Sequence, residues 1–449
     1  MKIKFCGATQ HVTGSNYWLE TDKQEQFLID CGLFQGARIQ EDFNFKPLLY
    51  DPSKIKNLIL THAHLDHCGR IPKLFAEGFN GSIYATEPTH DLTRIVLEDA
   101  VGLMQEESER DNDEPLYIAN DVQRSFQRWN YLNYHQEEKI GQGITIKLYD
   151  DGHILGSASV QVKTENKIIV FSGDIGNPPV PFLRPTEAIK ETDYLVIEST
   201  YGGIIHEPPQ ERLSKLQKAI TDTISAGGTL MIPAFAVERA QELLYEINEL
   251  VENKKIPQVP VFLDSPMAIK VTKVFRHFKE YYNSVDKLQS YREDLMHFPG
   301  LQMTESVEAS KKINDVKGAK VIIAGSGMMH GGRILHHAKR YLSDPNSALL
   351  IVGFQVEGSL GRRLYDGERK VTIHGEKINV KAKIKAIGAY SAHADQNGLL
   401  HFIDVMDKKP QKIFITHGEL TQSQALSEKI KEKFKIECVI PKFGDEHNL

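Results

Sequence analysis

The stretch Thr61-His62-Ala63-His64-Leu65-Asp66-His67-Cys68-Gly69 places three histidines and one aspartate within six positions, directly after the apolar run 58–60. Imidazole nitrogen and carboxylate oxygen are the ligands that suit zinc in an open, water-bearing site, whereas structural zinc is usually bound by paired cysteines. A stray pair of histidines is common without a metal, but four ligand-type residues in so short a loop favour a metal site. On a turning segment, His62 and His64 can face one position while Asp66 and His67 face another. One loop can therefore supply ligands to two metals.

Length and composition indicate a folded protein of two or three domains. The chain has 449 residues, of which 41% are hydrophobic and 25% are charged, as in ordinary globular proteins. The N-terminus lacks the apolar core of a secretory signal, and no apolar run approaches the roughly 18 residues of a membrane span. We therefore expect a cytoplasmic protein that does not enter a membrane. The four cysteines form no C-x-x-C pair and are expected to be reduced and mostly structural: Cys6, Cys31, Cys68 and Cys438.

Charge is unevenly distributed along the chain. The net charge is −6, which argues mildly against a surface built throughout for nucleic acid. Residues 311–390, however, contain 15 lysines and arginines against 6 aspartates and glutamates. An excess of this kind occurs on ordinary solvated faces as well as on phosphate-binding surfaces, so charge alone leaves both interpretations open.

Short β-like runs broken by turn residues precede the metal loop, at residues 2–6, 16–20, 26–30 and 56–61. Asp30 ends the third run, so its carboxylate stands at the end of a strand and faces a loop. After the metal loop, the spacing of apolar residues predicts helices over 89–104 and 121–132, and a strand resumes near 144–148.

Three further polar groups each stand just after a strand-like run. His153 lies in Gly152-His153-Ile154-Leu155-Gly156, where the flanking glycines let the backbone turn sharply and aim the ring. Asp174 follows the run 167–171 and Glu198 follows the run 194–197. We expect His153 to supply a further ligand and Asp174 to bridge two metals. Repeated strand-end acids indicate one shared rim.

After about residue 203, strand-like and helix-like segments alternate, which is typical of an α/β unit with a parallel sheet. Two glycine-rich turns, 325–333 and 353–363, follow strands of this part and lie in the basic region. Exposed backbone amides beside arginine suit phosphate oxygens, although a glycine-rich turn is more often a plain loop.

The last segment returns to strands, and each of two histidines comes just past one. His393 follows the run 381–387, and His417 follows the run 411–415. The other histidines lack this context, and we interpret them as structural or surface groups; examples are His11, His90, His336 and His337.

Together these motifs resemble the metallo-β-lactamase superfamily and, within it, the β-CASP nucleases that process RNA. Seven motifs in order carry the resemblance, which spans nearly the whole chain and is closest to short bacterial and archaeal homologues of the cleavage and polyadenylation specificity factor nuclease. The motifs are Phe27-Leu28-Ile29-Asp30, the cluster His62 to His67, Gly152 to Gly156, Ser172-Gly173-Asp174, Glu198-Ser199-Thr200-Tyr201-Gly202, Ser391-Ala392-His393-Ala394-Asp395 and Thr416-His417-Gly418-Glu419.

The resemblance implies an α/β fold: an αββα metallo-β-lactamase sandwich with an inserted parallel-sheet β-CASP domain. We expect the first part of the sandwich over 1–203, the insertion over 204–370 and the returning part over 371–449. By the same resemblance, His62, His64 and His153 would bind one zinc ion and Asp66, His67 and His417 a second, with Asp174 as the bridge.

Other roles follow from the same resemblance. Asp30 would orient the ligands, His393 would be the general acid, Glu198 would orient His393, and Asp66 counts among the catalytic residues as well as the ligands. Phosphates of the RNA backbone would be bound by Ser326, Gly327, Arg333, Ser391 and Ala392.

The expected activity is hydrolysis of single-stranded RNA by a hydroxide held between two zinc ions, with cleavage at internal bonds. A 5′–3′ exoribonuclease is the nearest alternative, because only the shape of the cleft separates the two modes. Alternatives of a different class are an RNA-binding scaffold without catalysis and a small-ester hydrolase on the same metal core. A homodimer is the commonest oligomer to expect.

Overall fold

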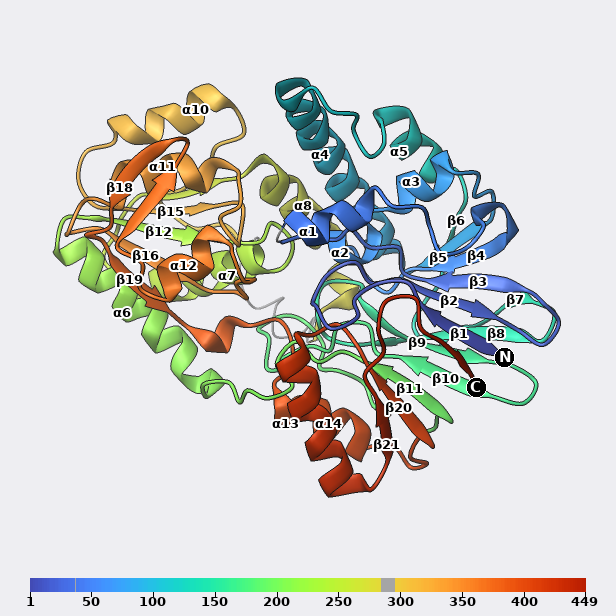
Figure 1. Ribbon diagram of the computed structural model, residues 1–449. Helices are drawn as coiled ribbons and strands as arrows, with labels where there is room; N and C mark the ends of the chain where they lie inside the picture. Colours follow the sequence, from blue (N-terminus) through green and yellow to red (C-terminus); the bar gives the residue numbers. More distant parts are fainter. Residues whose placement is uncertain (37, 284–294) are drawn as a thin grey trace. The chain divides into compact units, whose positions relative to one another are not determined.

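The computed structural model describes residues 1–36, 38–283 and 295–449 (Figure 1). The chain forms two compact units. The first unit comprises Met1–Pro178, Leu183–Ile205 and His393–Leu449, and the second comprises Pro179–Phe182 and His206–Ala392. The second unit is therefore an insertion in the sequence of the first.

The first unit contains two seven-stranded mixed sheets. In spatial order, the strands of one sheet are β22 (Glu446–Asn448), β1 (Lys2–Phe5), β2 (Tyr17–Glu20), β3 (Gln26–Ile29), β4 (Ile55–Ile59), β5 (Ser82–Ala85) and β6 (Trp129–Tyr131). Those of the other are β21 (Glu437–Val439), β20 (Lys412–Ile415), β11 (Tyr194–Ile197), β10 (Ile168–Phe171), β9 (Ala158–Lys163), β8 (Ile144–Asp150) and β7 (Glu137–Gly141). Because β1 pairs with β22, the two termini lie side by side (Figure 1).

Aromatic and branched side chains from both sheets meet in one core. Phe5 of β1 packs on Phe414 of β20 with ring centroids 5.2 Å apart, and Tyr17 of β2 packs on Phe171 of β10 at 5.5 Å. Alternation along β8, where every second residue is buried, directs one face of that strand into this core. The two sheets therefore form a sandwich.

Helices cover the outer faces of the sandwich (Figure 1). On one side lie α1 (Arg38–Glu41), α2 (Leu65–Cys68), α3 (Ile71–Ala76), α4 (Glu87–Asp111) and α5 (Ala119–Ser125), and on the other α13 (Gln396–Asp404) and α14 (Leu420–Phe434). Leu399 and Phe402 of α13 and Leu426 of α14 form a core with Leu195 and Ile413 of the sheet. The helix α4 begins where Thr86 accepts a hydrogen bond from the backbone amide of Thr89, and it ends at Asn112 in the left-handed region.

The second unit is built on one six-stranded sheet in which every strand pair is parallel. Its spatial order is β14 (Leu301–Met303), β13 (Val261–Asp264), β15 (Lys320–Ala324), β12 (Thr229–Pro233), β16 (Ala348–Ile351) and β19 (Lys383–Ala386). All residues of β12, β13, β15 and β16 are buried, as expected for central strands covered on both faces.

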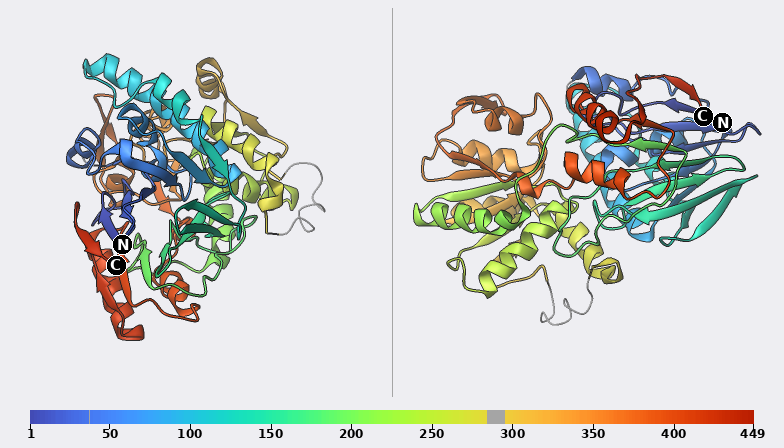
Figure 2. Two further views of the ribbon diagram at one scale, coloured as in Figure 1. Left: turned by 90° about the vertical axis from the view of Figure 1, so that its right-hand side faces the viewer. Right: turned by 90° about the horizontal axis from the view of Figure 1, so that it is seen from below.

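Helices and one hairpin complete this unit (Figures 1 and 2). They are α6 (Arg212–Ser225), α7 (Arg239–Glu252), α8 (Pro266–His277), α10 (Val307–Lys312), α11 (Arg333–Tyr341), α12 (Leu360–Tyr365) and the hairpin β17 (Lys370–Ile373) with β18 (Glu376–Asn379). Ile334 of α11, Leu364 of α12 and Val371 of the hairpin share a core with Leu349 of the sheet.

The expected fold class, an αββα sandwich with an inserted parallel-sheet α/β domain, is confirmed. One expected element is wrong. The helix predicted over 121–132 ends at Ser125, because Trp129–Tyr131 instead pairs with Ile83–Ala85 as the edge strand β6. The end of the insertion at residue 370, expected from the resemblance, stays a prediction; by contacts, residues up to Ala392 cluster with the second unit, since β19 pairs with β16. In the described part of the chain, no helix is long and apolar enough to span a membrane.

Candidate metal centre

Five ends of neighbouring strands meet at one edge of the sandwich in the first unit. Asp30 and the loop beginning at Thr61 follow β3 and β4, which are parallel neighbours. Asp174, Glu198 and His417 follow β10, β11 and β20, which are parallel neighbours in the other sheet. Because parallel strands direct their carboxyl ends to the same edge, side chains distant in sequence are brought together there.

The first group of ligand-type atoms consists of three imidazoles and one carboxylate. Nδ1 of His64 lies 3.1 Å from Nε2 of His62 and 3.1 Å from Nε2 of His153. Oδ2 of Asp174 lies 3.4 Å from Nε2 of His62 and 3.5 Å from Nε2 of His153. These four residues can hold one metal ion.

The second group lies around the other oxygen of the same carboxylate. Oδ1 of Asp174 lies 3.3 Å from Nε2 of His67 and 3.6 Å from Nε2 of His417, and Oδ2 of Asp66 lies 3.7 Å from Nε2 of His417. Asp66, His67 and His417 can therefore hold a second ion, with Asp174 shared between the groups.

The spacing of these atoms fits zinc. Nitrogen and oxygen ligands bind zinc at about 2.0–2.2 Å, so tetrahedral ligand atoms lie roughly 3.4 Å from one another. Within the described residues, the buried atoms Asp174 Oδ1 and His417 Nε2 have no hydrogen-bond partner. Buried polar atoms are rarely left unsatisfied, and two that point into a cluster of metal-ligand atoms fit a bound cation.

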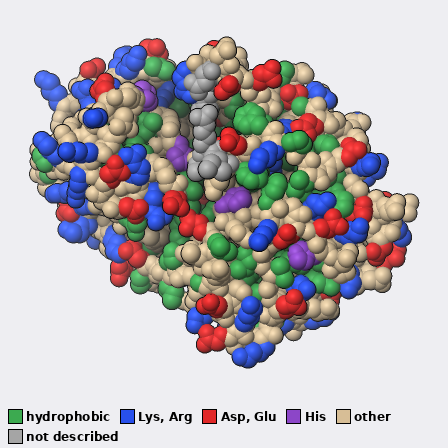
Figure 3. Space-filling model, in the orientation of Figure 1, with side chains coloured by type: hydrophobic (Ala, Val, Ile, Leu, Met, Phe, Trp, Pro, Cys, Tyr) green, Lys and Arg blue, Asp and Glu red, His purple; other side chains and the backbone are tan. Residues whose placement is uncertain are grey.

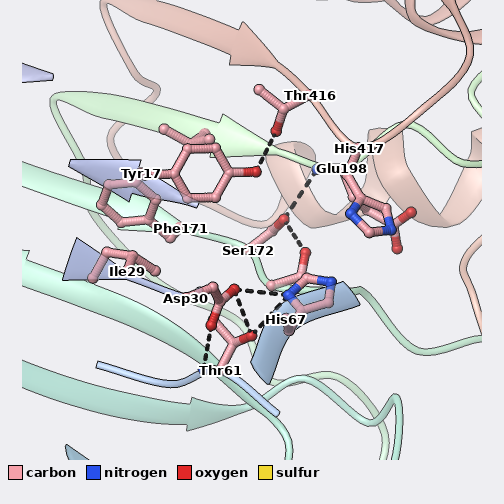
Figure 4. A pocket seen from close by; sticks show the side chains of 12 residues that line it. Tyr17, Ile29, Asp30, Thr61, His67, Phe171, Ser172, Glu198, Thr416 and His417 are labelled. Carbon is pink, nitrogen blue, oxygen red and sulfur yellow. Dashed lines mark hydrogen bonds and ion pairs between the residues drawn. The ribbon is translucent and has the colours of Figure 1, made fainter. Parts of the chain in front are cut away.

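Hydrogen bonds behind the cluster fix its rings. Nδ1 of His67 donates to Oδ2 of Asp30 at 2.7 Å, and Asp30 also accepts from the amide and the hydroxyl of Thr61 (Figure 4). On the other side, Nδ1 of His417 lies 2.8 Å from the hydroxyl of Ser15. Each ring thereby turns its Nε2 towards Asp174, which is the usual way of orienting metal-binding histidines.

The loop that carries His153 is held by a buried acid. Asp151 accepts hydrogen bonds from the backbone amide of His153 and the hydroxyl of Ser157. Gly152 adopts a φ of +70°, and a Cβ there would lie 2.8 Å from the backbone oxygen of Arg184. Glycine is therefore required for this turn.

His393 and Glu198 lie beside both groups. Nδ1 of His393 is 3.2 Å from each oxygen of Glu198, which also accepts from the backbone amides of Ile175 and Thr200. An isolated antiparallel β-bridge between the backbones of His393 and Gly176 holds the histidine next to the turn that carries Asp174. The His393 side chain is 14% exposed, whereas those of His62, His67, His153 and His417 are at most 2% exposed, so His393 stands on the solvent side of the cluster.

The electrostatics of the metal-free site follow from its crowding. Burial opposes charge on His393, but the Glu198 and Asp174 carboxylates outweigh it and raise the pKa of this imidazole to about 9. Burial and the neighbouring imidazoles lower the pKa of His417 to about 3 in spite of the Asp174 carboxylate. Without metal, His393 is therefore cationic at neutral pH, whereas His417 is neutral, as a ligand must be.

Three family models match consecutive parts of the chain. A metallo-beta-lactamase superfamily domain matches residues 18–191, a Beta-Casp domain 240–364, and a Zn-dependent metallo-hydrolase RNA specificity domain 377–441. A ribonuclease from Thermus thermophilus is 37% identical over 99% of both chains. The chain belongs to the β-CASP family of the metallo-β-lactamase superfamily. The expected resemblance is thus confirmed, and this β-CASP protein is a metal-dependent hydrolase.

Other relatives of this β-CASP protein come from archaea. An RNase J-like protein of Methanocaldococcus jannaschii is 34% identical over 98% of both chains. The transcription termination factor FttA of Pyrococcus horikoshii is 33% identical over 98% of this chain and 70% of its own. A solved structure of a protein of unknown function from Enterococcus faecalis aligns over 100% of this chain and 99% of its own, with a TM-score of 0.55 and 12% identity, which shows the fold alone.

The residues expected to bind RNA phosphates lie in the second unit of the β-CASP protein: Ser326, Gly327, Arg333, Ser391 and Ala392. The guanidinium of Arg333 donates to Asp264 at 2.7 Å and to the backbone oxygens of Thr304 and Glu305. The hydroxyl of Ser326 bonds to the backbone of Gly331. These polar groups are therefore engaged inside their own unit.

The ten residues expected at the metal centre all lie together in the first unit: Asp30, His62, His64, Asp66, His67, His153, Asp174, Glu198, His393 and His417. Three supporting residues were not predicted, namely Ser15, Thr61 and Asp151. Thr61 stands inside the quoted motif, and Asp151 stands next to His153, so position alone could have indicated both. Ser15 has no such signal, because it meets His417 only where the two sheets pack face to face.

Proposed function

We propose that this protein is a ribonuclease that uses two zinc ions to hydrolyse internal phosphodiester bonds of single-stranded RNA. The observation that carries the proposal is the position of Asp174, whose two oxygens face two separate ligand groups. His62, His64 and His153 would hold one ion, and Asp66, His67 and His417 the other. The named activity of the Thermus relative supports RNA as the substrate.

When bound, the two ions would supply Lewis acidity, which activates water and offsets charge that develops on the phosphate. The residues of this chain supply the rest. Asp30 holds His67 in one tautomer, and the hydroxyl of Ser15 orients the ring of His417. Glu198 holds Nδ1 of His393, so that a proton on Nε2 can pass to the leaving oxygen. Asp30, Glu198 and His417 each come just after the end of a strand, so the sheets fix their positions.

Time courses with circular and 5′-labelled linear RNA test this proposal. Protein loaded with zinc is expected to cut both RNAs, whereas His64→Ala and His393→Ala are expected to cut neither at a comparable rate. His336→Ala, which removes an exposed histidine outside the cluster, is the matched control and should keep full activity. If only the linear RNA is consumed and mononucleotides are released from its 5′ end, the protein is an exonuclease and not an endonuclease. Zinc-loaded protein that cuts neither RNA would remove the ribonuclease assignment.

A further inference from the structure

A groove of about 440 Å³ lies in the second unit, between the end of α12 and the strand β19. One wall contains Leu364, Tyr365 and residues 367–369, and the other contains the consecutive residues 381–386. No motif of the metal centre contributes to it.

The groove follows the free edge of the sheet. Among the described residues, β19 is the last strand of the six-stranded sheet, where it pairs only with β16. Successive strand residues point to opposite faces of a sheet, so a hollow on one face would be lined by every second residue. Here all residues from Lys381 to Ala386 line it, and the groove therefore runs along the strand edge, where backbone amides and carbonyls are available to a ligand.

The walls of the groove are strongly cationic. Arg369, Lys381 and Lys383 are exposed, and among the described residues they form no ion pair. Lys385 is also in the wall and pairs with Asp222 at 2.9 Å. The only acid of the wall, Glu368, is already bound by Arg363 at 2.6 Å. Figure 3 shows lysine and arginine side chains gathered on the surface of this unit (left).

An aromatic side chain accompanies these charges. Tyr365 is 57% exposed and lines the groove. An aromatic ring beside free cations is the combination that binds single-stranded nucleic acid, since the ring stacks on a base while the cations contact phosphates. Lysines on an edge strand also prevent sheets from pairing edge to edge, which accounts for Lys383. That role does not account for Arg369 and Tyr365, which reach the groove from outside the strand.

We propose that this groove is a second binding site for single-stranded RNA, formed by Tyr365, Arg369, Lys381 and Lys383. The proposal rests on the proposed ribonuclease function for the choice of RNA over other anionic polymers. The site would hold a segment of the substrate by its phosphate backbone and one stacked base, with little preference for sequence. It assigns a function to the excess of positive charge over residues 311–390.

Equilibrium binding of a fluorescein-labelled 20-nucleotide oligouridylate tests the site. All proteins carry His393→Ala so that the RNA is not consumed, and all are loaded with zinc. The groove variant is Arg369→Gln, Lys381→Gln and Lys383→Gln combined. Its affinity is expected to fall at least about tenfold at about 0.1 M salt, and the slope of log affinity against log salt is expected to decrease by about 2, because three phosphate contacts are lost.

The matched control removes three other exposed lysines of the same unit that do not line the groove: Lys254→Gln, Lys255→Gln and Lys312→Gln combined. It should change affinity by less than about twofold. Equal loss in both variants would show general charge attraction and overturn the site. Binding of a fluorescein-labelled polyglutamate peptide is measured with the same proteins. If the groove variant loses affinity for this peptide but not for RNA, the groove binds an acidic protein segment, and the RNA assignment is overturned.

Tyr365→Leu keeps the charge and an apolar side chain while it removes the ring. A loss of about fivefold or more is expected for one stacked base, and unchanged affinity would overturn the stacking part of the proposal. Cleavage of circular RNA by the wild-type chain is scored separately. If RNA binding depends on the groove but the wild type does not cleave RNA, the binding site is retained and the ribonuclease function is rejected. If the wild type cleaves RNA but binding does not depend on the groove, the ribonuclease function is retained and the binding site is rejected.

Discussion

Asp174 in the first unit and Asp264 in the second stand in similar positions but in different surroundings. Each follows or ends a strand of a parallel pair, is buried and lies against histidine. Asp264 is fully satisfied: Arg333 and Thr304 donate to Oδ1, and His337 and Ser310 donate to Oδ2. Asp174 is surrounded by imidazoles, no arginine or lysine pairs with it, and its Oδ1 has no hydrogen-bond donor in the described residues.

The difference shows what separates a metal site from a structural network of the same residue types. A carboxylate whose lone pairs are filled by protein donors has no place for an ion, and its histidine serves as one more donor. A carboxylate that faces several imidazole nitrogens and has an oxygen without a hydrogen-bond donor can share a cation from solution with them. An unsatisfied carboxylate oxygen that faces several imidazoles, rather than the number of histidines alone, marks the candidate centre.

Removal of the shared carboxylate should have the largest effect. Asp174→Asn removes a negative charge shared by both ligand groups, so we expect zinc to be lost. The rate of RNA cleavage should fall by about a thousandfold or more, equivalent to several kcal/mol of transition-state stabilisation. Zinc content measured by atomic absorption and single-turnover cleavage check this. Asp264→Asn is the matched variant and should keep its zinc. Equal zinc loss in both would break the distinction between the two aspartates.

His393→Ala should come next. Without a proton donor at the solvent side of the cluster, cleavage should fall by about a hundredfold to ten-thousandfold. Zinc content should stay at the wild-type level, because His393 belongs to neither of the two proposed ligand groups. If zinc were lost together with activity, His393 would be a ligand rather than an acid.

A smaller effect is expected for Asp30→Asn. The variant keeps the shape of the side chain but weakens the hydrogen bond from His67, and such changes typically cost about 10- to 100-fold in metal affinity or activity. Competition with a zinc-binding dye measures the affinity directly. Unchanged affinity would mean that Thr61 and the fold alone hold the His67 ring.

The smallest expected effect concerns stability in acid. Burial opposes ionisation of Asp264, but hydrogen bonds from His337, Ser310, Thr304 and Arg333 outweigh it and lower the pKa of this carboxyl to about 2. A depressed pKa contributes stability above the ordinary value of 3.8 and loses it as the pH falls towards 2. After allowance for solvent screening, this is about 1–2 kcal/mol. Urea unfolding of zinc-free protein at pH 5 and pH 2.5 should show a smaller pH dependence in Asp264→Asn than in the wild type.

The metal centre could be predicted because its residues come in short local motifs at strand ends. The cluster from His62 to His67 and the glycine-flanked His153 carry their chemistry in a few consecutive residues. What the sequence did not show depends on distant segments meeting. Ser15 reaches His417 across the sandwich edge, and Trp129–Tyr131 becomes a strand only because β5 offers it a partner. Likewise, the hydrogen bonds of Arg333 go to Asp264 in β13 and to the backbone of Thr304 just after β14, both distant in sequence.

The metal centre draws its ligands from both ends of the chain, and this has a consequence in time. The ligands of the first group are complete once Asp174 has been synthesised, whereas the second group waits for His417. At translation rates of about 5–20 residues per second, roughly 20–70 s separate the synthesis of His67 from that of His417. During that interval the nascent chain carries a half-built centre, and the whole insertion is made before it can close. In the proposed two-ion centre, the second ion can therefore bind only after His417 has been synthesised.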